Sequence, residues 1–222
     1  MALDVLVVAP LHHELEGILT KQDEPIEISG KRVVGTLIGV GKVVSALATQ
    51  QAILAYQPKQ VVLLGFGGAV DPNLEIGSAL IATKVVQYDL DLRRFRLARG
   101  DTFGPEGTVV KGTLDLFAPP LDGFAPAVFG TADRFLLRSE REQHPELATE
   151  LGIGLADMEG YPVALACRMH HIPCTLLRIV SDDAHGRRAK QFSVFAKQGR
   201  KKLSEGLHSL LEEPREKSPT SL

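Results

Sequence analysis

Two acidic clusters in the second half of the chain carry side chains that could do chemistry. The first is Asp157-Met158-Glu159 and the second is Ser181-Asp182-Asp183. A helix pattern and a buried-strand pattern lie between them, and a strand–helix–strand crossover brings such groups to one end of a sheet. Carboxylates accept hydrogen bonds from hydroxyl groups and exchange protons with a reacting base. The spacing therefore predicts that Glu159 and Asp182 face one pocket for a small molecule.

Two further charged residues lie where strand patterns would bury them or aim them at this pocket. Glu14 follows the apolar run 3–9 and begins a predicted helix, which is where ligand groups sit in open α/β folds. Arg178 lies inside the apolar stretch 174–180, and a buried guanidinium needs a carboxylate partner. Taken singly, Glu14 is better explained as a solvated helix-start residue and Asp182 could be an N-cap. Only the combined set favours a site.

Two predicted strands end in glycine-rich turns. Gly39-Val40-Gly41-Lys42 follows one, and Gly65-Phe66-Gly67-Gly68-Ala69 follows the strand 60–64. Glycine lets the backbone approach a ligand closely and leaves amide donors accessible. Neither turn has the GxGxxG spacing of a dinucleotide site or a Walker A sequence, so we exclude both cofactor motifs. Plain strand-to-helix connections explain the turns equally well.

The elements that must position these groups alternate along the chain. Apolar, β-branched runs predict strands over 3–9, 31–39, 60–64, 78–87, 124–131 and 174–180. Helical spacing predicts helices over 11–20, 43–55, 138–151 (interrupted near Pro145), 161–170 and 192–211. Less regular stretches indicate a strand within 88–99 and a short helix at 114–117. This is an α/β pattern, and it predicts a three-layer αβα sandwich around a mostly parallel mixed sheet. We expect one domain over residues 1–211 and a disordered polar tail over 212–222.

Composition excludes several classes of protein. The 222 residues carry a net charge of −2, so nothing favours nucleic acid or a membrane surface as a partner. No apolar run approaches a membrane span, and the first residues do not resemble a signal peptide. The two cysteines fit buried, reduced thiols, and the adjacent histidine pairs lack metal-ligand spacing. We expect a cytoplasmic protein with no metal.

Taken in order, six segments resemble the nucleoside phosphorylase/nucleosidase superfamily, and within it the bacterial 5′-methylthioadenosine/S-adenosylhomocysteine nucleosidases. The resemblance covers about residues 3–211. Its most specific part is the order and spacing of Met-Glu-Gly and Arg-x-x-Ser-Asp. The segments are Glu14, Gly39–Lys42, Gly65–Gly68, Asp133-Arg134-Phe135, Asp157-Met158-Glu159-Gly160 and Arg178-Ile179-Val180-Ser181-Asp182.

The resemblance implies a division of roles that suits cleavage of an N-glycosidic bond. That reaction passes through an oxocarbenium-like sugar, so it needs an acid for the leaving purine and a base for water. Asp182 would protonate purine N7, Glu14 would be the base, and Arg178 would hold the water or Glu14. Glu159 would accept hydrogen bonds from the ribose 2′- and 3′-hydroxyls. The other substrate-binding residues implied are Met158 on the ribose, Phe135 on the purine, Val40 on the sugar side, and Ser181, Phe66 and Gly67.

The same resemblance narrows the substrate. Aspartate at position 182 goes with adenine and asparagine with 6-oxopurines, so adenine nucleosides with a modified 5′ group are favoured. No basic residue precedes the glycine turns to bind phosphate, so water is the expected nucleophile. The alternatives are a futalosine or aminodeoxyfutalosine hydrolase, a phosphate-dependent phosphorylase, and a non-catalytic nucleoside-binding protein. The resemblance implies no cofactor and a homodimer.

The chain departs from the family pattern in three places. Phe66 stands where a small hydroxyl residue is usual, and Tyr161-Pro162 replaces small residues after Met-Glu-Gly. The segment after Asp182 is short and basic where a longer lid is usual. These segments shape the space for the 5′ substituent, so the bond-breaking chemistry transfers better than the identity of that group.

Overall fold

A computed structural model describes residues 3–19, 21–183, 185, 187 and 192–212. One mixed nine-stranded sheet forms the centre, in the order β10-β9-β5-β11-β4-β1-β3-β2, with β8 paired to β5. The bounds are β1 Val5–Ala9, β2 Ile26–Ile28, β3 Lys31–Leu37, β4 Gln60–Ala69, β5 Ala79–Gln87, β8 Thr113–Asp115, β9 Ala125–Thr131, β10 Ile153–Asp157 and β11 Cys174–Asp182.

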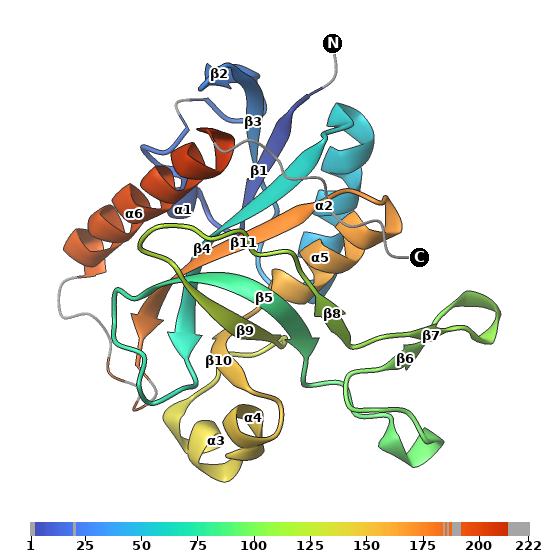
Figure 1. The fold of residues 1–222 in the computed structure, drawn as a ribbon. Coiled ribbons are helices and arrows are strands. Elements are labelled where there is room, and N and C mark those ends of the chain that lie inside the picture. Colours follow the sequence, from blue (N-terminus) through green and yellow to red (C-terminus); the bar gives the residue numbers. More distant parts are fainter. Residues whose placement is uncertain (1–2, 20, 184, 186, 188–191, 213–222) are drawn as a thin grey trace.

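Helices cover both faces of this sheet (Figure 1). On one face α2 (Lys42–Tyr56) packs against α5 (Gly160–Met169), and on the other α6 (Phe192–Glu212) packs against α1 (His12–Leu15). Two separate groups of buried apolar side chains fill the layers on either side of the sheet. The predicted αβα sandwich around a mixed sheet is therefore confirmed.

The sheet also closes on itself at one end. β10 is parallel to β9, yet it also pairs antiparallel with β4, through Leu155 opposite Ala69 and Ala156 opposite Gly68. Strands β10, β9, β5, β11 and β4 thus form a closed ring. Because β4, β10 and β11 all take part, the ring gathers the ends of three chemistry-bearing strands.

The glycine stretch after residue 64 continues β4 and is not a turn, which corrects the sequence prediction. A side chain at Gly67 would lie 2.6 Å from the Leu155 side chain and 2.9 Å from the Ala156 carbonyl oxygen. Glycine in a strand often marks such a close approach of another backbone. The residues that indicated a turn are the ones that let β10 close the ring.

Three other local predictions were wrong. The helix expected over 11–20 ends at Leu15, since Gly17 takes a φ of +76°. Residues 114–117 do not form a helix, because Leu114 lies in β8 opposite Val85. Residues 88–99 contain the 3₁₀ turn Arg93–Phe95, and the Asp91 carboxylate accepts from the Arg93 backbone and side chain. The chain then runs into the small β6–β7 hairpin (Thr102–Phe103 and Val109–Val110), which projects from the body in Figure 1.

The remaining helix predictions agree with the structure. The break near Pro145 separates α3 (Arg138–Gln143) from α4 (Glu146–Thr149). Within the described ranges, no helix is long and apolar enough to cross a membrane. The predicted tail lies outside the described residues except for Glu212, which ends α6.

Candidate active site

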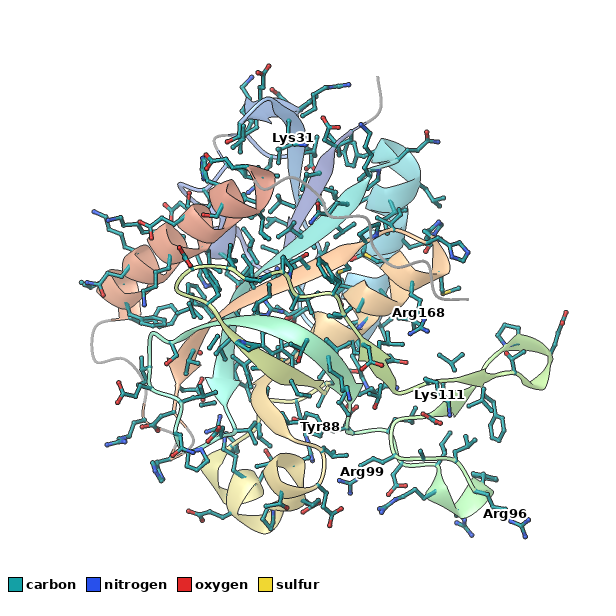
Figure 2. All side chains as sticks on the ribbon, in the orientation of Figure 1. Lys31, Tyr88, Arg96, Arg99, Lys111 and Arg168 are labelled. Carbon is teal, nitrogen blue, oxygen red and sulfur yellow. The ribbon has the colours of Figure 1, made fainter. Side chains whose placement is uncertain are left out.

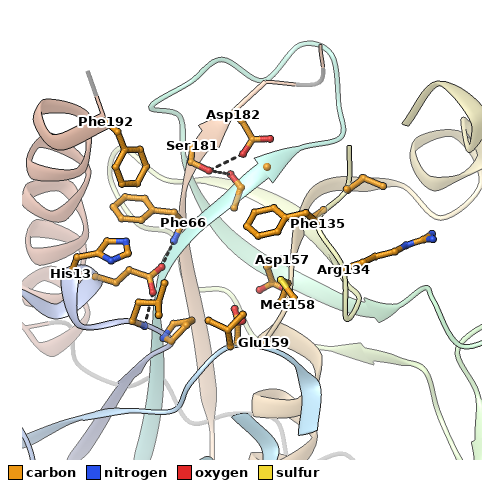
Figure 3. Close-up of a pocket in the computed structure, with 18 of the residues that line it drawn as sticks. His13, Phe66, Arg134, Phe135, Asp157, Met158, Glu159, Ser181, Asp182 and Phe192 are labelled. Atoms are coloured by element: carbon orange, nitrogen blue, oxygen red, sulfur yellow. Dashed lines mark hydrogen bonds between the residues drawn. The ribbon is translucent and has the colours of Figure 1, made fainter. Parts of the chain in front are cut away.

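A cavity of about 540 Å³ opens at the ends of β1, β4, β10 and β11. Figure 3 shows its charged and aromatic side chains converging from these strands and from the segments that follow them. Of the ten residues predicted for the site, only Arg178 does not reach the cavity surface. The nine that line it are Glu14, Val40, Phe66, Gly67, Phe135, Met158, Glu159, Ser181 and Asp182.

Arg178 lies beneath the cavity and is fully buried. Its Nε and Nη2 donate to Asp157 Oδ2 at 3.1 and 2.9 Å, and Nη2 also donates to Glu159 Oε2 at 3.1 Å. The other oxygen of Asp157 accepts from the Thr131 hydroxyl and the Gly160 amide. This network neutralises a buried cation with two carboxylates. Arg178 therefore acts on the site by positioning Glu159.

Glu14 lies on the other side of Arg178 and is also buried. Its Oε1 accepts from the Phe66 amide and its Oε2 from the Leu11 amide, both at 2.9 Å. Burial raises the pKa of this carboxyl, while the Arg178 charge and the two amides act in the opposite direction. The ion pairs of Arg178 run to Asp157 and Glu159, so its influence on Glu14 is that of a nearby charge.

Gly65 makes this arrangement possible. A methyl group there would lie 2.0 Å from Arg178 Nη1 and 2.6 Å from Glu14 Oε1. Any side chain would therefore push the guanidinium or the carboxylate out of place. Gly65 thus leaves the space that Arg178 and Glu14 occupy beneath the cavity.

Glu159 carries a second buried carboxyl group of the cavity wall. Besides Arg178, it accepts from the Gly41 amide at 3.1 Å. Burial raises its pKa to about 7, and the neighbouring Asp157 charge adds to the rise while Arg178 opposes it. A desolvated carboxyl beside a cavity is a strong candidate for a ligand contact.

Asp182 lies at the opposite wall and is held by two partners. Its Oδ1 accepts from the Ser181 hydroxyl at 2.9 Å, and its Oδ2 from Arg141 Nη2 at 2.8 Å. Arg141 comes from α3, and its Nη1 donates to the Asp183 carbonyl oxygen. The guanidinium of Arg141 thus binds one of the two carboxylate oxygens of Asp182.

Aromatic rings from three segments form another side of the cavity. His13 and Phe66 are stacked with ring centroids 6.1 Å apart, and Phe192 meets both edge-on. Figure 3 shows these rings on one side and Phe135 with Arg134 on the other. The cavity therefore offers an aromatic wall, a buried carboxylate and a carboxylate–arginine pair.

This geometry can bind a molecule that has hydroxyl groups and a flat ring. Comparison with known proteins assigns the chain to a family. The model of the phosphorylase superfamily matches residues 25–212. The chain belongs to the phosphorylase superfamily. The predicted resemblance is confirmed at that level.

Individual members of this superfamily resemble the chain over most of its length. Aminodeoxyfutalosine nucleosidase of Helicobacter pylori is 29% identical over 191 residues, covering 82% of this chain and 81% of that protein. The 5′-methylthioadenosine/S-adenosylhomocysteine nucleosidase of Shewanella frigidimarina is 27% identical over 219 residues, with 92% and 88% covered. A crystal structure of the Helicobacter pylori 5′-methylthioadenosine/S-adenosylhomocysteine nucleosidase, complexed with a substituted pyrrolidin-3-ol, superposes with a TM-score of 0.79. It is 25% identical, with 95% of this chain and 98% of that chain covered.

Asp157, His13, Phe192 and Arg141 are among the cavity-lining residues that were not predicted as site residues. Asp157 had a signal, because Arg178 in an apolar strand demands a buried carboxylate. His13 and Phe192 had a weaker one, since both flank segments that were assigned to the site. Arg141 had none: it stands in the charged run RSEREQ, which suggests a solvated helix. Within the described part of the chain, no three metal-binding side chains gather.

Proposed function

We propose that this protein hydrolyses the N-glycosidic bond of an adenine nucleoside modified at the 5′ position and releases adenine. The observation that carries the proposal is that Glu14, Glu159 and Asp182 line one cavity while Arg178 lies buried beneath it. Hydrolysis of this bond needs groups for the sugar, the water and the leaving base. The cavity has a carboxyl group for each. The likeness to nucleosidases of adenine nucleosides supports the assignment.

Glu159 is the group assigned to the sugar. Arg178 and the Gly41 amide fix its two oxygens, and these oxygens retain lone pairs for the 2′- and 3′-hydroxyls. Met158 and Val40 line the same region and supply apolar contacts for the ribose. A fixed sugar brings C1′ into range of the other groups, which is the main benefit of positioning.

Glu14 is the base assigned to water. The Phe66 and Leu11 amides hold its carboxylate at the cavity wall. As the bond between C1′ and N9 breaks, water adds to C1′ and gives a proton to Glu14. A raised pKa brings a carboxylate nearer to the value of an effective base at neutral pH.

Asp182 is assigned to the leaving purine, with Phe135 available to stack on the ring. The purine leaves with the electron pair of the broken bond and takes up a proton at N7 from Asp182, which acts in its protonated form and regains a proton from solvent after the products leave. Arg141 occupies Oδ2 of Asp182, so the base meets Oδ1 or displaces the guanidinium. The purine would therefore either replace Arg141 at Oδ2 of Asp182 or bind beside the ion pair of Arg141 and Asp182.

Adenine release tests the proposal. Purified protein is incubated with 5′-methylthioadenosine, S-adenosylhomocysteine and 5′-deoxyadenosine, with and without phosphate, and adenine is followed by chromatography. We expect phosphate-independent release, with Glu14→Gln and Asp182→Asn each lowering kcat by about 10²–10⁴-fold. The matched control is Glu16→Gln, two residues away, where the carboxylate is exposed and pairs with Arg200. Release that required phosphate would identify a phosphorylase, and tight binding without turnover would identify a nucleoside-binding protein.

A second substrate class is favoured by the aromatic wall. His13, Phe66 and Phe192 line the cavity and pack against one another, whereas a small thioether needs only an apolar surface. Nucleosides of the futalosine type carry an aryl group on the 5′ side, and such a ring gains from stacked and edge-on contacts. Comparing kcat/KM for aminodeoxyfutalosine and 5′-methylthioadenosine under identical conditions decides between the two. A preference of tenfold or more for the thioether would reject the aryl substrate.

The proposal includes a homodimer in the cytoplasm. Four apolar side chains of α2 are exposed, and the helix begins at the cavity wall: Val43, Val44, Leu47 and Leu54. A second copy of the chain would cover this face, and the free cysteines Cys167 and Cys174 fit a reducing compartment. Sedimentation of the wild type and of Leu47→Lys tests the dimer. A wild type that stays monomeric at high concentration would refute it.

A further inference from the structure

The contact between Arg141 and Asp182 leaves the arginine with more donors than partners. A guanidinium has five N–H donors, and two of them serve Asp182 Oδ2 and the Asp183 carbonyl oxygen. The Arg141 side chain is only 7% exposed, and its Nε is buried with no hydrogen-bond partner among the described residues. A buried polar atom without a partner is costly, so each such atom calls for an explanation.

The surrounding strands are shaped to admit this guanidinium. A methyl group at Gly68 would lie 2.6 Å from Arg141 Nη2 and 2.8 Å from Asp182 Oδ2. Gly68 also lies in the pairing that closes the ring, opposite Ala156 of β10. The arginine therefore occupies a built position against the backbone of β4, and it forms part of the cavity wall.

This pair changes what the cavity offers to a base. A carboxylate alone presents only acceptors, which suit the amino group of adenine. A carboxylate that holds an arginine presents acceptors and donors side by side. The oxygen at C6 of a 6-oxopurine is an acceptor, so a free carboxylate would repel it while a guanidinium binds it.

We propose that Arg141 reads the C6 substituent of the purine and extends the substrate class to 6-oxopurine nucleosides, such as those of hypoxanthine. This inference rests on the proposed function, since it assigns the same cavity a second base. In the complex, one N–H of Arg141 donates to the oxygen at C6 while another stays on Asp182. Adenine binds through the remaining acceptor capacity of the carboxylate.

The test compares adenine with hypoxanthine in wild type, Arg141→Met, Arg141→Lys and Arg134→Met. Calorimetry gives the affinities for the two free bases, and kcat/KM is measured for 5′-methylthioadenosine and 5′-methylthioinosine. Arg134→Met is the matched control, because Arg134 also lines the cavity but pairs with Glu140. We expect Arg141→Met to weaken hypoxanthine at least tenfold more than adenine, as for a lost hydrogen bond to a charged group. Arg141→Lys should recover part of the loss, and Arg134→Met should keep the wild-type ratio.

The remaining outcomes separate this inference from the proposed function. The role of Arg141 is refuted if wild type binds no hypoxanthine, or if Arg141→Met lowers the affinity for both bases equally. Neither result bears on the proposal that the protein releases adenine. If wild type binds both bases but cleaves neither nucleoside, the hydrolase proposal fails. The affinities of wild type and Arg141→Met for the two bases then still test whether Arg141 binds the oxygen at C6. If Arg141→Met does not fold, the affinities of wild type and Arg141→Lys for the two bases test the role of Arg141 instead.

Discussion

The two walls of the cavity are built in different ways. The inner wall consists of Glu14, Asp157 and Glu159, and all three are buried around Arg178, which lies beneath the cavity. Hydrogen bonds from backbone amides and from the guanidinium hold these carboxylates in place. The outer wall consists of Asp182 with Arg141, and of the rings of His13, Phe66 and Phe192. Most of its parts come from α3, α1 and the first turn of α6. A buried hydrogen-bond network thus fixes the carboxylates that we assign to the sugar and the water, whereas an ion pair and a group of rings form the parts that we assign to the base and the 5′ group.

Removing the buried cation should have the largest effect. Arg178→Met leaves Asp157 and Glu159 buried without their partner, which costs about 3–5 kcal/mol in the free energy of unfolding. Arg93→Met breaks an exposed ion pair with Asp91 and should cost less than about 1 kcal/mol. Denaturant titration measures both. Equal losses would mean that the inner wall is no more tightly held than the surface.

Filling the space beside that cation comes next. Gly65→Ala places a methyl group against Arg178 and Glu14, and overpacking of this kind costs about 1–3 kcal/mol. The control is Gly154→Ala in β10, where the nearest contact to the added carbon is an ordinary 3.5 Å from Ala127. We expect Gly65→Ala to lower both thermal stability and adenine release. A variant as stable and active as Gly154→Ala would contradict the tight packing of the inner wall.

The titration of Glu159 should give a smaller, pH-dependent effect. Its folded-state pKa of about 7 lies above the ordinary value of 4.5, so the folded chain holds this proton better than the unfolded chain. The resulting stabilisation is fully present below about pH 4.5 and is lost as the pH rises through 7. Relative to Glu159→Gln, wild type should lose about 1–2 kcal/mol of stability between pH 5.5 and 8. Glu27→Gln, at an exposed position of β2, is the control. A constant difference between wild type and Glu159→Gln would refute the raised pKa.

The outer wall should respond in selectivity more than in stability. Phe192→Leu removes a ring that lines the cavity, and a contact between this ring and an aryl group of the substrate would be worth about 0.5–1.5 kcal/mol, so kcat/KM for an aryl-tailed nucleoside should fall about two- to tenfold. The value for 5′-methylthioadenosine should change less than about twofold. Phe117→Leu changes an exposed ring that does not line the cavity and serves as the control. Equal losses on both substrates would place the 5′ group elsewhere.

The same division explains what the sequence could predict. Arg178 stood out because a charged residue inside an apolar strand needs a carboxylate partner, whereas Glu159 and Asp182 stood out only in combination with it. Arg141 did not stand out because a short charged helix looks solvated unless its neighbours in space are known. The ring closure was also hidden, since a glycine run in β4 has the composition of a turn and only Leu155 in β10 explains it.

The antiparallel contact of β10 with β4 has a consequence for how the site forms. Leu155 meets Ala69 across more than eighty residues of chain, and such long-range pairings form slowly because loop closure precedes any gain in contacts. Glu159 follows β10 and Gly65 lies in β4, so the inner wall exists only once the two strands have joined. A ligand that contacts both Glu159 and Asp182 would therefore bind only after β10 has paired with β4. Amide protons of β4 and β10 should then exchange together, and a bound nucleoside should slow both equally.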